Sequence, residues 1–226
     1  MVILEYLGHS GFVISDGSHK VVIDPFLTGN PLAVHKPENI ECDWIVLTHG
    51  HGDHIGDTVQ IAQANNATVH CMYELSEYLA EQDVEVSPGN TGGGIDLGFG
   101  RSTLVQAFHS SSFEGRYLGN PCGVILELGE VTIYHVGDSG LFGDMQLFGD
   151  IFRPDVALIP VGDRFTMGPK LATIAAELIS PRIAIPIHYK TFPELLISDS
   201  SEFQPRGIEV HVMEAGDVFD VEPLTL

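Results

Sequence analysis

The chain has 226 residues, of which 44% are hydrophobic and 18% charged, which excludes a disordered or fibrous protein and suits a single globular domain over residues 1–226. Its formal net charge of −21 would repel nucleic acid and anionic membranes. No apolar stretch approaches the roughly 20 residues that span a bilayer, and Met1–Tyr6 does not read as a secretory signal. We therefore expect a cytoplasmic protein with neither a nucleic-acid nor a membrane partner.

The first ninety residues contain short strand-like runs separated by Gly, Asp, Ser and Pro turn signals, and two helix-like segments. The predicted strands are Val2–Leu7, Gly11–Ser15, Lys20–Asp24, Asp43–Thr48 and Ala67–Cys71. The predicted helices are Asp57–Asn65 and Glu74–Gln82.

Strand-like runs also dominate the rest of the chain, after a Gly-rich segment, Gly89–Gly100, that is expected to be a turn region. The predicted strands are Thr103–His109, Cys122–Leu128, Val131–His135, Val156–Pro160 and Ile183–Ile187, followed by a closing pair, Ile208–Met213 and Asp217–Val221. One helix is predicted at Pro169–Ile179. The pattern favours an α/β fold, a four-layer αβ/βα sandwich of two mixed sheets flanked by helices, although periodicity does not determine the strand order.

The three cysteines, Cys42, Cys71 and Cys122, are widely spaced and form no C-x-x-C pair. Cys71 and Cys122 lie at predicted strand positions. We interpret all three as small buried thiols, since neither a disulfide framework nor a thiolate metal site is supported.

The strongest functional signal is the segment His49–His54, which reads His-Gly-His-Gly-Asp-His and directly follows an apolar strand. Three imidazoles and a carboxylate within six positions far exceed what a core or a solvated loop requires. The glycines let the backbone turn sharply, and imidazole and carboxylate are common ligands of divalent metals. The segment therefore predicts a metal site, and a polar loop with histidines by chance is the weaker interpretation.

Three further polar side chains follow other predicted strands. His109 ends the run from Thr103, Asp138 lies in a Gly-Asp-Ser-Gly turn after His135, and His188 follows the apolar run Ile183–Ile187. Each is placed where a rigid strand passes into a loop, which is where functional residues tend to lie. We expect these residues to complete the metal shells.

Together these motifs resemble the metallo-β-lactamase superfamily. More narrowly, the chain is similar to its small single-domain metal-dependent hydrolases, related to ascorbate-6-phosphate lactonase. The narrower similarity includes the segments Gly8–Phe12, Ile23–Pro31, His109–Ser112 and Gly162–Pro169.

The resemblance implies two divalent metal ions, and neither shell has lost a ligand. It implies His49, His51 and His109 on one ion. It implies Asp53, His54 and His188 on the other, with Asp138 bridging both. Zn²⁺ is the expected metal, with Mn²⁺ second and Fe²⁺ also acceptable to such a shell.

A metal-bound water whose pKa falls to about 7 would supply hydroxide to attack a small ester, lactone, amide or phosphoester. Asp53 and Asp138 would orient this hydroxide, as ligands rather than as free bases. With the hydroxide included, the cluster carries a charge of about +1, so an anionic small-molecule substrate is expected.

Two other classes of function remain as alternatives to hydrolysis. The same fold can hold iron for oxidoreductase chemistry, as in persulfide dioxygenases, and oxygen-dependent turnover would identify that class. A non-catalytic metal-binding domain is disfavoured because no ligand is missing. A homo-oligomer is suggested by family resemblance alone.

Five other residues are weaker candidates near the site. Asp24 follows a strand and is either a turn acid or, as the family resemblance suggests, a group that orients a ligand histidine. The same resemblance implies that His9 contacts substrate or supports a ligand, and His135 is expected to be a hydrogen-bonded histidine of the core or behind a ligand rather than a ligand itself. Arg164 and Lys190 could each hold a substrate anion, although ordinary surface ion pairs are slightly favoured.

Overall fold

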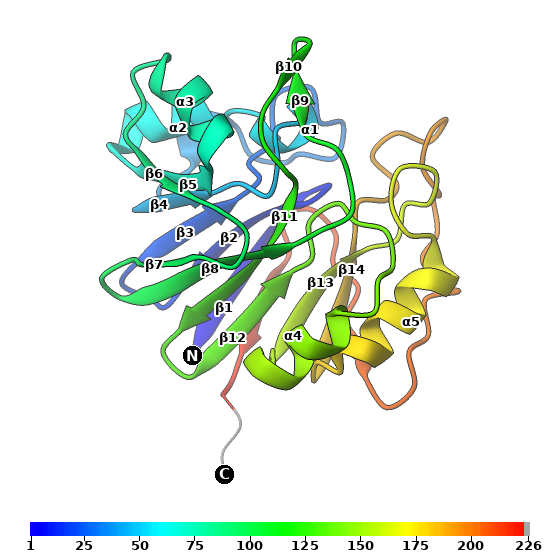
Figure 1. Ribbon diagram of the computed structural model, residues 1–226. Helices are drawn as coiled ribbons and strands as arrows, with labels where there is room; N and C mark the ends of the chain where they lie inside the picture. Colours follow the sequence, from blue (N-terminus) through cyan, green and yellow to red (C-terminus); the bar gives the residue numbers. More distant parts are fainter. Residues whose placement is uncertain (224–226) are drawn as a thin grey trace.

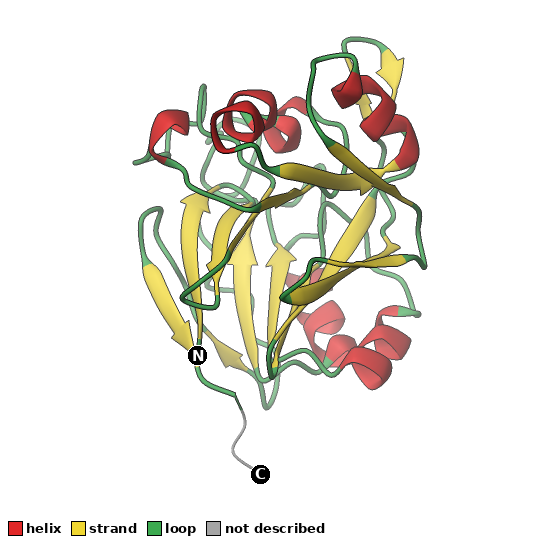
Figure 2. Ribbon diagram, turned by 90° about the vertical axis from the view of Figure 1, so that its left-hand side faces the viewer, coloured by secondary structure: helices red, strands yellow, loops and turns green. Residues whose placement is uncertain are grey.

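The computed structural model describes residues 1–223. Two seven-stranded mixed sheets face each other and carry helices on their outer sides, so the predicted four-layer α/β sandwich is confirmed (Figure 1). Figure 2 shows the same arrangement from the side, with strands in the middle of the molecule and helices at its periphery.

The first sheet has the strand order β16-β1-β2-β3-β4-β5-β6. Its strands are β1 (Val2–Gly8), β2 (Gly11–Ser15), β3 (Lys20–Ile23), β4 (Trp44–Val46), β5 (Thr68–Met72), β6 (Val86–Gly89) and β16 (Val218–Val221). The pairs from β16 to β3 are antiparallel, and those from β3 to β6 are parallel.

The second sheet has the order β15-β14-β13-β12-β11-β8-β7, and like the first it has one parallel and one antiparallel half. Its strands are β7 (Gly94–Asp96), β8 (Gly100–Gln106), β11 (Cys122–Leu128), β12 (Val131–His135), β13 (Val156–Pro160), β14 (Ile183–Ile187) and β15 (Glu209–Val210). The pairs among β12 to β15 are parallel, and those among β7, β8, β11 and β12 are antiparallel.

Short helices connect and cover these strands, and a small hairpin projects above the sheets (Figure 1). The helices are α1 (Gly52–Ile55), α2 (Thr58–Asn65), α3 (Tyr73–Ala80), α4 (Met145–Phe152), α5 (Pro169–Ile179) and a 3-10 turn, η1 (Pro37–Asn39). The hairpin pairs β9 (Ser112–Phe113) with β10 (Arg116–Tyr117).

The core follows from the two-residue period of the strands. On β3, Val21 and Ile23 face the other sheet, while Val22 belongs to the cluster on the outer side of the first sheet. Strands β13 and β14 are buried along their whole lengths, because the facing sheet covers one side and helices the other. These two strands therefore read as continuous apolar runs in the sequence.

Strand direction explains why polar loops gather in one place. In the first sheet β1, β3 and β4 run in the same direction, and in the second sheet β8, β12 and β14 do so. The C-terminal ends of each set therefore lie at a common edge of their sheet, which is where α/β folds place their sites. The residues that follow these strands form the candidate site.

Two expectations about individual segments are wrong. Gly89–Gly100 is not only a turn region, because it contains β7, which pairs with β8. The closing strands do not pair with each other: β15 joins β14 in the second sheet, and β16 joins β1 in the first. The chain therefore crosses from one sheet to the other between these two strands.

The three cysteines are free and buried, as expected. Burial raises the pKa of each thiol, and for Cys42 to about 12. Within residues 1–223, no helix has the length and apolar character needed to cross a membrane.

Candidate metal centre

The segment His49–His54 joins the end of β4 to α1. His51 is the residue before the helix, and Asp53 and His54 lie on the helix itself. A side chain at Gly50 would have its Cβ 2.8 Å from Leu118, so only glycine fits there. This close turn sends His49 and His51 toward one point and leaves the helix to direct Asp53 and His54 toward another.

One group of imidazoles consists of His49, His51 and His109. The Nε2 of His49 lies 2.9 Å from the Nδ1 of His51, and the Nε2 of His109 lies 3.3 Å from that same atom. Ligand atoms held tetrahedrally on one ion at 2.0–2.1 Å lie about 3.3 Å apart. The spacing of these nitrogens therefore suits a shared metal ion.

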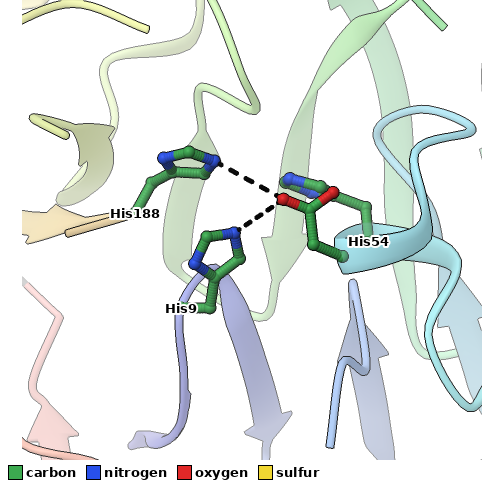
Figure 3. A group of neighbouring side chains, drawn as sticks. His9, His54 and His188 are labelled. Carbon is green, nitrogen blue, oxygen red and sulfur yellow. Dashed lines mark hydrogen bonds and ion pairs between the residues drawn. The ribbon is translucent and has the colours of Figure 1, made fainter. Parts of the chain in front are cut away.

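A second group consists of Asp53, His54 and His188, and Asp138 lies between the two groups. Asp138 Oδ2 is 3.0 Å from His188 Nε2 and 3.5 Å from His109 Nε2. Its Oδ1 is 3.4 Å from His54 Nε2. His188 Nε2 is 3.9 Å from Asp53 Oδ2, and Figure 3 shows His188 and His54 directed toward the same space.

Buried polar atoms at this point lack partners. Among the described residues, His54 Nε2 and Asp138 Oδ1 are shielded from solvent and make no hydrogen bond, and the nearest ion-pair partner of each is the other, at 3.4 Å. A buried polar atom without a partner costs free energy unless something else binds it. A nitrogen lone pair and a carboxylate oxygen are the donors that a divalent cation requires, so the residues fit a metal ion.

Asp24 orients His54 from behind. Its Oδ2 lies 2.7 Å from His54 Nδ1, and the carboxylate also accepts the Thr48 amide at 2.9 Å and the Thr48 hydroxyl at 2.6 Å. Because a carboxylate only accepts, His54 carries its proton on Nδ1 and presents a lone pair on Nε2. Asp24 is thus not merely a turn acid, and it contacts a predicted ligand directly.

His9 and His135 are both fully buried, and a ring nitrogen of His9 lies within 4.8 Å of ligand atoms of Asp53, His54 and His188. His9 contacts Asp53 through Nε2, at 3.1 Å. His135 Nε2 donates to the Ser10 carbonyl at 2.8 Å, and its Nδ1 accepts the Gly137 amide at 3.0 Å. His135 therefore supports the turns that carry other site residues without reaching the centre.

Arg164 and Lys190 differ in their surroundings. Lys190 forms an ion pair with Glu214, at 2.6 Å, as the surface interpretation expects. Arg164 has no acidic partner among residues 1–223, and its guanidinium lies 5.3 Å from the centre of the Phe165 ring. Phe165 is 50% exposed and, with Ser110, lines a cavity of about 380 Å³ above the two groups of ligands.

The electrostatics differ between the two groups. Burial lowers the pKa of His49, His51 and His109, so these imidazoles are neutral and available as ligands at pH 7. Burial also disfavours the charged form of His54, but Asp138 and Asp24 outweigh it and raise its pKa well above the usual value, so a metal ion that binds Nε2 would first displace a proton from it.

The carboxylates remain ionised in spite of their surroundings. Burial alone would raise the pKa of Asp53 and of Asp138, yet the neighbouring imidazoles lower both below the ordinary range. For Asp53 the main opposing contribution is the hydrogen bond from His9. Burial, together with His188, lowers the pKa of His9 to about 4, so His9 is neutral.

Four further residues shape the site, and two of them, Ser111 and Phe165, lie within the segments that are similar to the family. Thr48 links Asp24 to His49, whose Nδ1 is 3.0 Å from the Thr48 hydroxyl. Ser111 accepts the Gly50 amide at 3.0 Å, Thr191 contacts His9, and Phe165 lines the cavity. Thr48 and Ser111 adjoin predicted segments and could have been found, whereas nothing in the local sequence marks Thr191.

Comparison with known families agrees with this fold. The family model described as "Beta-lactamase superfamily domain" matches residues 3–188. The solved structure of Igni18, a metallo hydrolase from Ignicoccus hospitalis, is 34% identical and superposes with a TM-score of 0.88 over 98% of this chain and 99% of its own. Fold and site thus define a metal-dependent hydrolase of the metallo-β-lactamase superfamily.

Curated relatives narrow this class further. A "UPF0173 metal-dependent hydrolase" of Archaeoglobus fulgidus is 46% identical over 93% of this chain and 94% of its own length. Another protein of the same name, from Carboxydothermus hydrogenoformans, is 45% identical over 95% of this chain and 98% of its own length. The chain belongs to the UPF0173 metal-dependent hydrolase family. A solved isothiocyanate hydrolase, 18% identical with a TM-score of 0.77 over 98% of this chain and 100% of its own, shares the fold.

Proposed function

We propose that the chain is one hydrolase domain that binds two divalent metal ions. His49, His51 and His109 would hold one ion, Asp53, His54 and His188 the other, and Asp138 would contact both. The observation that carries this proposal is the position of Asp138, whose carboxylate lies 3.0–3.5 Å from an imidazole nitrogen of each group. The unpartnered His54 Nε2 and Asp138 Oδ1 support it as well.

The metal ions would supply a hydroxide nucleophile at neutral pH and stabilise the negative charge that develops during hydrolysis. The residues of the chain prepare this centre. The ionised carboxylates of Asp53 and Asp138 offset positive charge and are placed to orient the nucleophile. Asp24 keeps the Nε2 lone pair of His54 directed inward, and Ser111 holds the Gly50 turn in place.

The proposed substrate is a small anionic ester, lactone, amide or phosphoester. A cavity of about 380 Å³ lies at the small end of the range for small-molecule sites. Arg164 does not line this cavity, but it lies next to Phe165, which does, and it has no acidic partner in the described chain, so it is suited to an anionic group that extends past Phe165. The motif resemblance to ascorbate-6-phosphate lactonase, which rests on the sequence alone, makes a phosphorylated lactone the first substrate to assay within this class.

The donor set guides the choice of metal. Five imidazoles and two carboxylates suit Zn²⁺, which is our first choice, and Mn²⁺ and Fe²⁺ bind similar shells. Metal-free protein reconstituted with each ion in turn, and assayed with phosphodiesters, lactones and thioesters, would identify both the metal and the substrate class. Turnover that requires O₂ would contradict hydrolysis and favour the iron-dependent oxidoreductase alternative.

The variant His51→Ala tests the metal centre directly. Removing this nitrogen, which lies 2.9–3.3 Å from two other imidazoles, should lower bound metal to about one ion per chain and reduce turnover by at least 100-fold. His19→Ala is the matched control, because His19 is paired with Asp16 at the surface. Metal content and rate that survive His51→Ala would refute the assignment.

A further inference from the structure

His9 has backbone contacts that join the two sheets beneath the metal centre. It follows β1 of the first sheet and has a left-handed backbone, with φ of 59°. Its carbonyl accepts the His188 amide at 2.7 Å and the Tyr6 hydroxyl at 2.8 Å. The backbone of His9 therefore ties down the segment of the second sheet that carries His188.

The side chain of His9 contacts the same group of proposed ligands. Its ring is fully buried and lies 4.2 Å, centre to centre, from the ring of His188. Its Nε2 lies 3.1 Å from Asp53 Oδ2, and its Nδ1 lies 2.8 Å from Thr191 Oγ1. Figure 3 shows His9 and His188 approaching one carboxylate oxygen from the same side.

The acceptors around His9 determine where its proton lies. The Asp53 carboxylate can only accept, so Nε2 carries the hydrogen and donates to it. Nδ1 then has a lone pair, and the Thr191 hydroxyl donates its one hydrogen to that lone pair at 2.8 Å rather than to the Tyr189 carbonyl, which is farther away at 3.4 Å. The result is a chain of two hydrogen bonds, from Thr191 to His9 and from His9 to Asp53, with a single direction.

This chain serves only one of the two ligand groups. Within residues 1–223, His9 makes no hydrogen bond or ring contact with His49, His51 or His109. Its contacts with ligands are to Asp53, to His188 and, edge to face, to the ring of His54.

We propose that His9 is a positioning residue that fixes the Asp53 carboxylate and the His188 segment for the metal ion of the group Asp53, His54 and His188. This inference rests on the proposed binuclear function. Groups that hydrogen-bond a ligand from behind change metal affinity by about 10–100-fold when removed. His9 should therefore affect one ion of the pair by this factor and leave the other unchanged.

The experiment titrates metal-free protein with Zn²⁺ against a chelating competitor. His9→Phe removes the donor but keeps a buried ring, whereas His9→Gln keeps an N–H that can reach Asp53. Two variants at Thr191 test the hydroxyl that contacts His9: Thr191→Val removes it, and Thr191→Ser keeps it. Thermal unfolding of each metal-free variant verifies that it folds, and the Thr191 pair carries the test if His9→Phe does not fold.

In the wild type we expect two ions, and in His9→Phe one of them bound at least 10-fold more weakly, with His9→Gln largely restored. Thr191→Val should weaken the same ion by a smaller factor and Thr191→Ser should not. To locate the loss, His9→Phe is combined with His109→Ala and separately with His188→Ala. In His109→Ala the ion that remains is the one held by Asp53, His54 and His188, and adding His9→Phe should weaken its binding further. In His188→Ala the other ion remains, and adding His9→Phe should leave its binding unchanged.

The outcomes separate this inference from the proposed function. A wild type that binds fewer than two ions overturns both. Two ions in the wild type, with equal weakening of both or of neither in His9→Phe, overturn the positioning role alone. If His9 were itself a ligand, His9→Gln would lose the ion as His9→Phe does and change the visible spectrum of the Co²⁺-substituted protein, and this result also overturns it.

Discussion

Replacing Asp24 with Asn would test how the site presents His54. Asp24 is fully buried, and its carboxylate accepts three hydrogen bonds, from the Thr48 amide, the Thr48 hydroxyl and His54 Nδ1. Asn is nearly the same shape and tolerates the left-handed backbone at this position, where φ is 47°. The substitution therefore changes hydrogen-bonding chemistry with little added strain.

In Asp24→Asn the amide oxygen can still accept the Thr48 amide, but an NH₂ group replaces the oxygen that faces His54. Two donors cannot share that contact, so His54 must accept on Nδ1 and move its proton to Nε2. An Nε2 that carries a proton cannot bind a metal ion. We expect the ion of this group to bind about 10–100-fold more weakly, which is about 1.4–2.7 kcal/mol.

Competition titration of the metal-free protein with Zn²⁺ and a chelator measures this change at constant pH. Asp16→Asn is the control. Asp16 is a surface carboxylate paired with His19, so this substitution makes the same chemical change far from the site. Unchanged affinity for both ions in Asp24→Asn would refute the argument that Asp24 sets the tautomer of His54.

Three further predictions concern the cavity, a thiol and a turn. Arg164→Gln should raise KM for anionic substrates by about two- to fivefold with kcat unchanged, and Arg164→Lys should raise KM by a smaller factor. An equal rise in KM for neutral substrates would contradict a charge contact. Cys42 keeps its proton in the folded chain up to about pH 12, whereas an unfolded thiol loses it near pH 8.5. Its contribution to stability is therefore complete below about pH 8.5 and declines as pH rises toward 12, and alkylation at pH 9 should be much slower in native than in urea-denatured protein. Gly56 has φ of 44°, and in Gly56→Ala the new Cβ would press against the Pro25 carbonyl. We therefore expect the free energy of unfolding in urea to fall by at least about 1–3 kcal/mol, and a variant as stable as the wild type would contradict this.

The fold class could be predicted because strands buried on both sides leave a clear signal. The runs Val156–Pro160 and Ile183–Ile187 are continuous apolar segments, and both are strands with exactly those bounds in the structure. Helix α4 was not predicted, since its residues are apolar around most of their circumference and Gly149 interrupts them. A side chain at Gly149 would meet the Ile179 carbonyl of α5, so this glycine reflects close helix packing that only the tertiary structure reveals.

The residues of the candidate site stand out in the sequence where its chemistry is local, whereas contacts across the fold leave little trace in the sequence alone. His49–His54 is a compact motif, and His109, Asp138 and His188 follow recognisable strands; the structure brings all of them together. The contact between Asp24 and His54 spans 30 positions, and that between His9 and Thr191 spans 182. No spacing pattern identifies side chains that support a site from such distances, so Asp24 and His9 were singled out through resemblance to the family, and Thr191 was not singled out at all.

The division of the proposed ligands between the sheets has a mechanical consequence. His49, His51, Asp53 and His54 follow a strand of the first sheet, and His109, Asp138 and His188 follow strands of the second. Each bound ion would then act as a cross-link between the two layers, at the rim of the core that they share. An ion present at 1,000 times its dissociation constant adds about 4 kcal/mol to the free energy of unfolding. The catalytic centre would thereby also govern how readily the two halves of the sandwich separate.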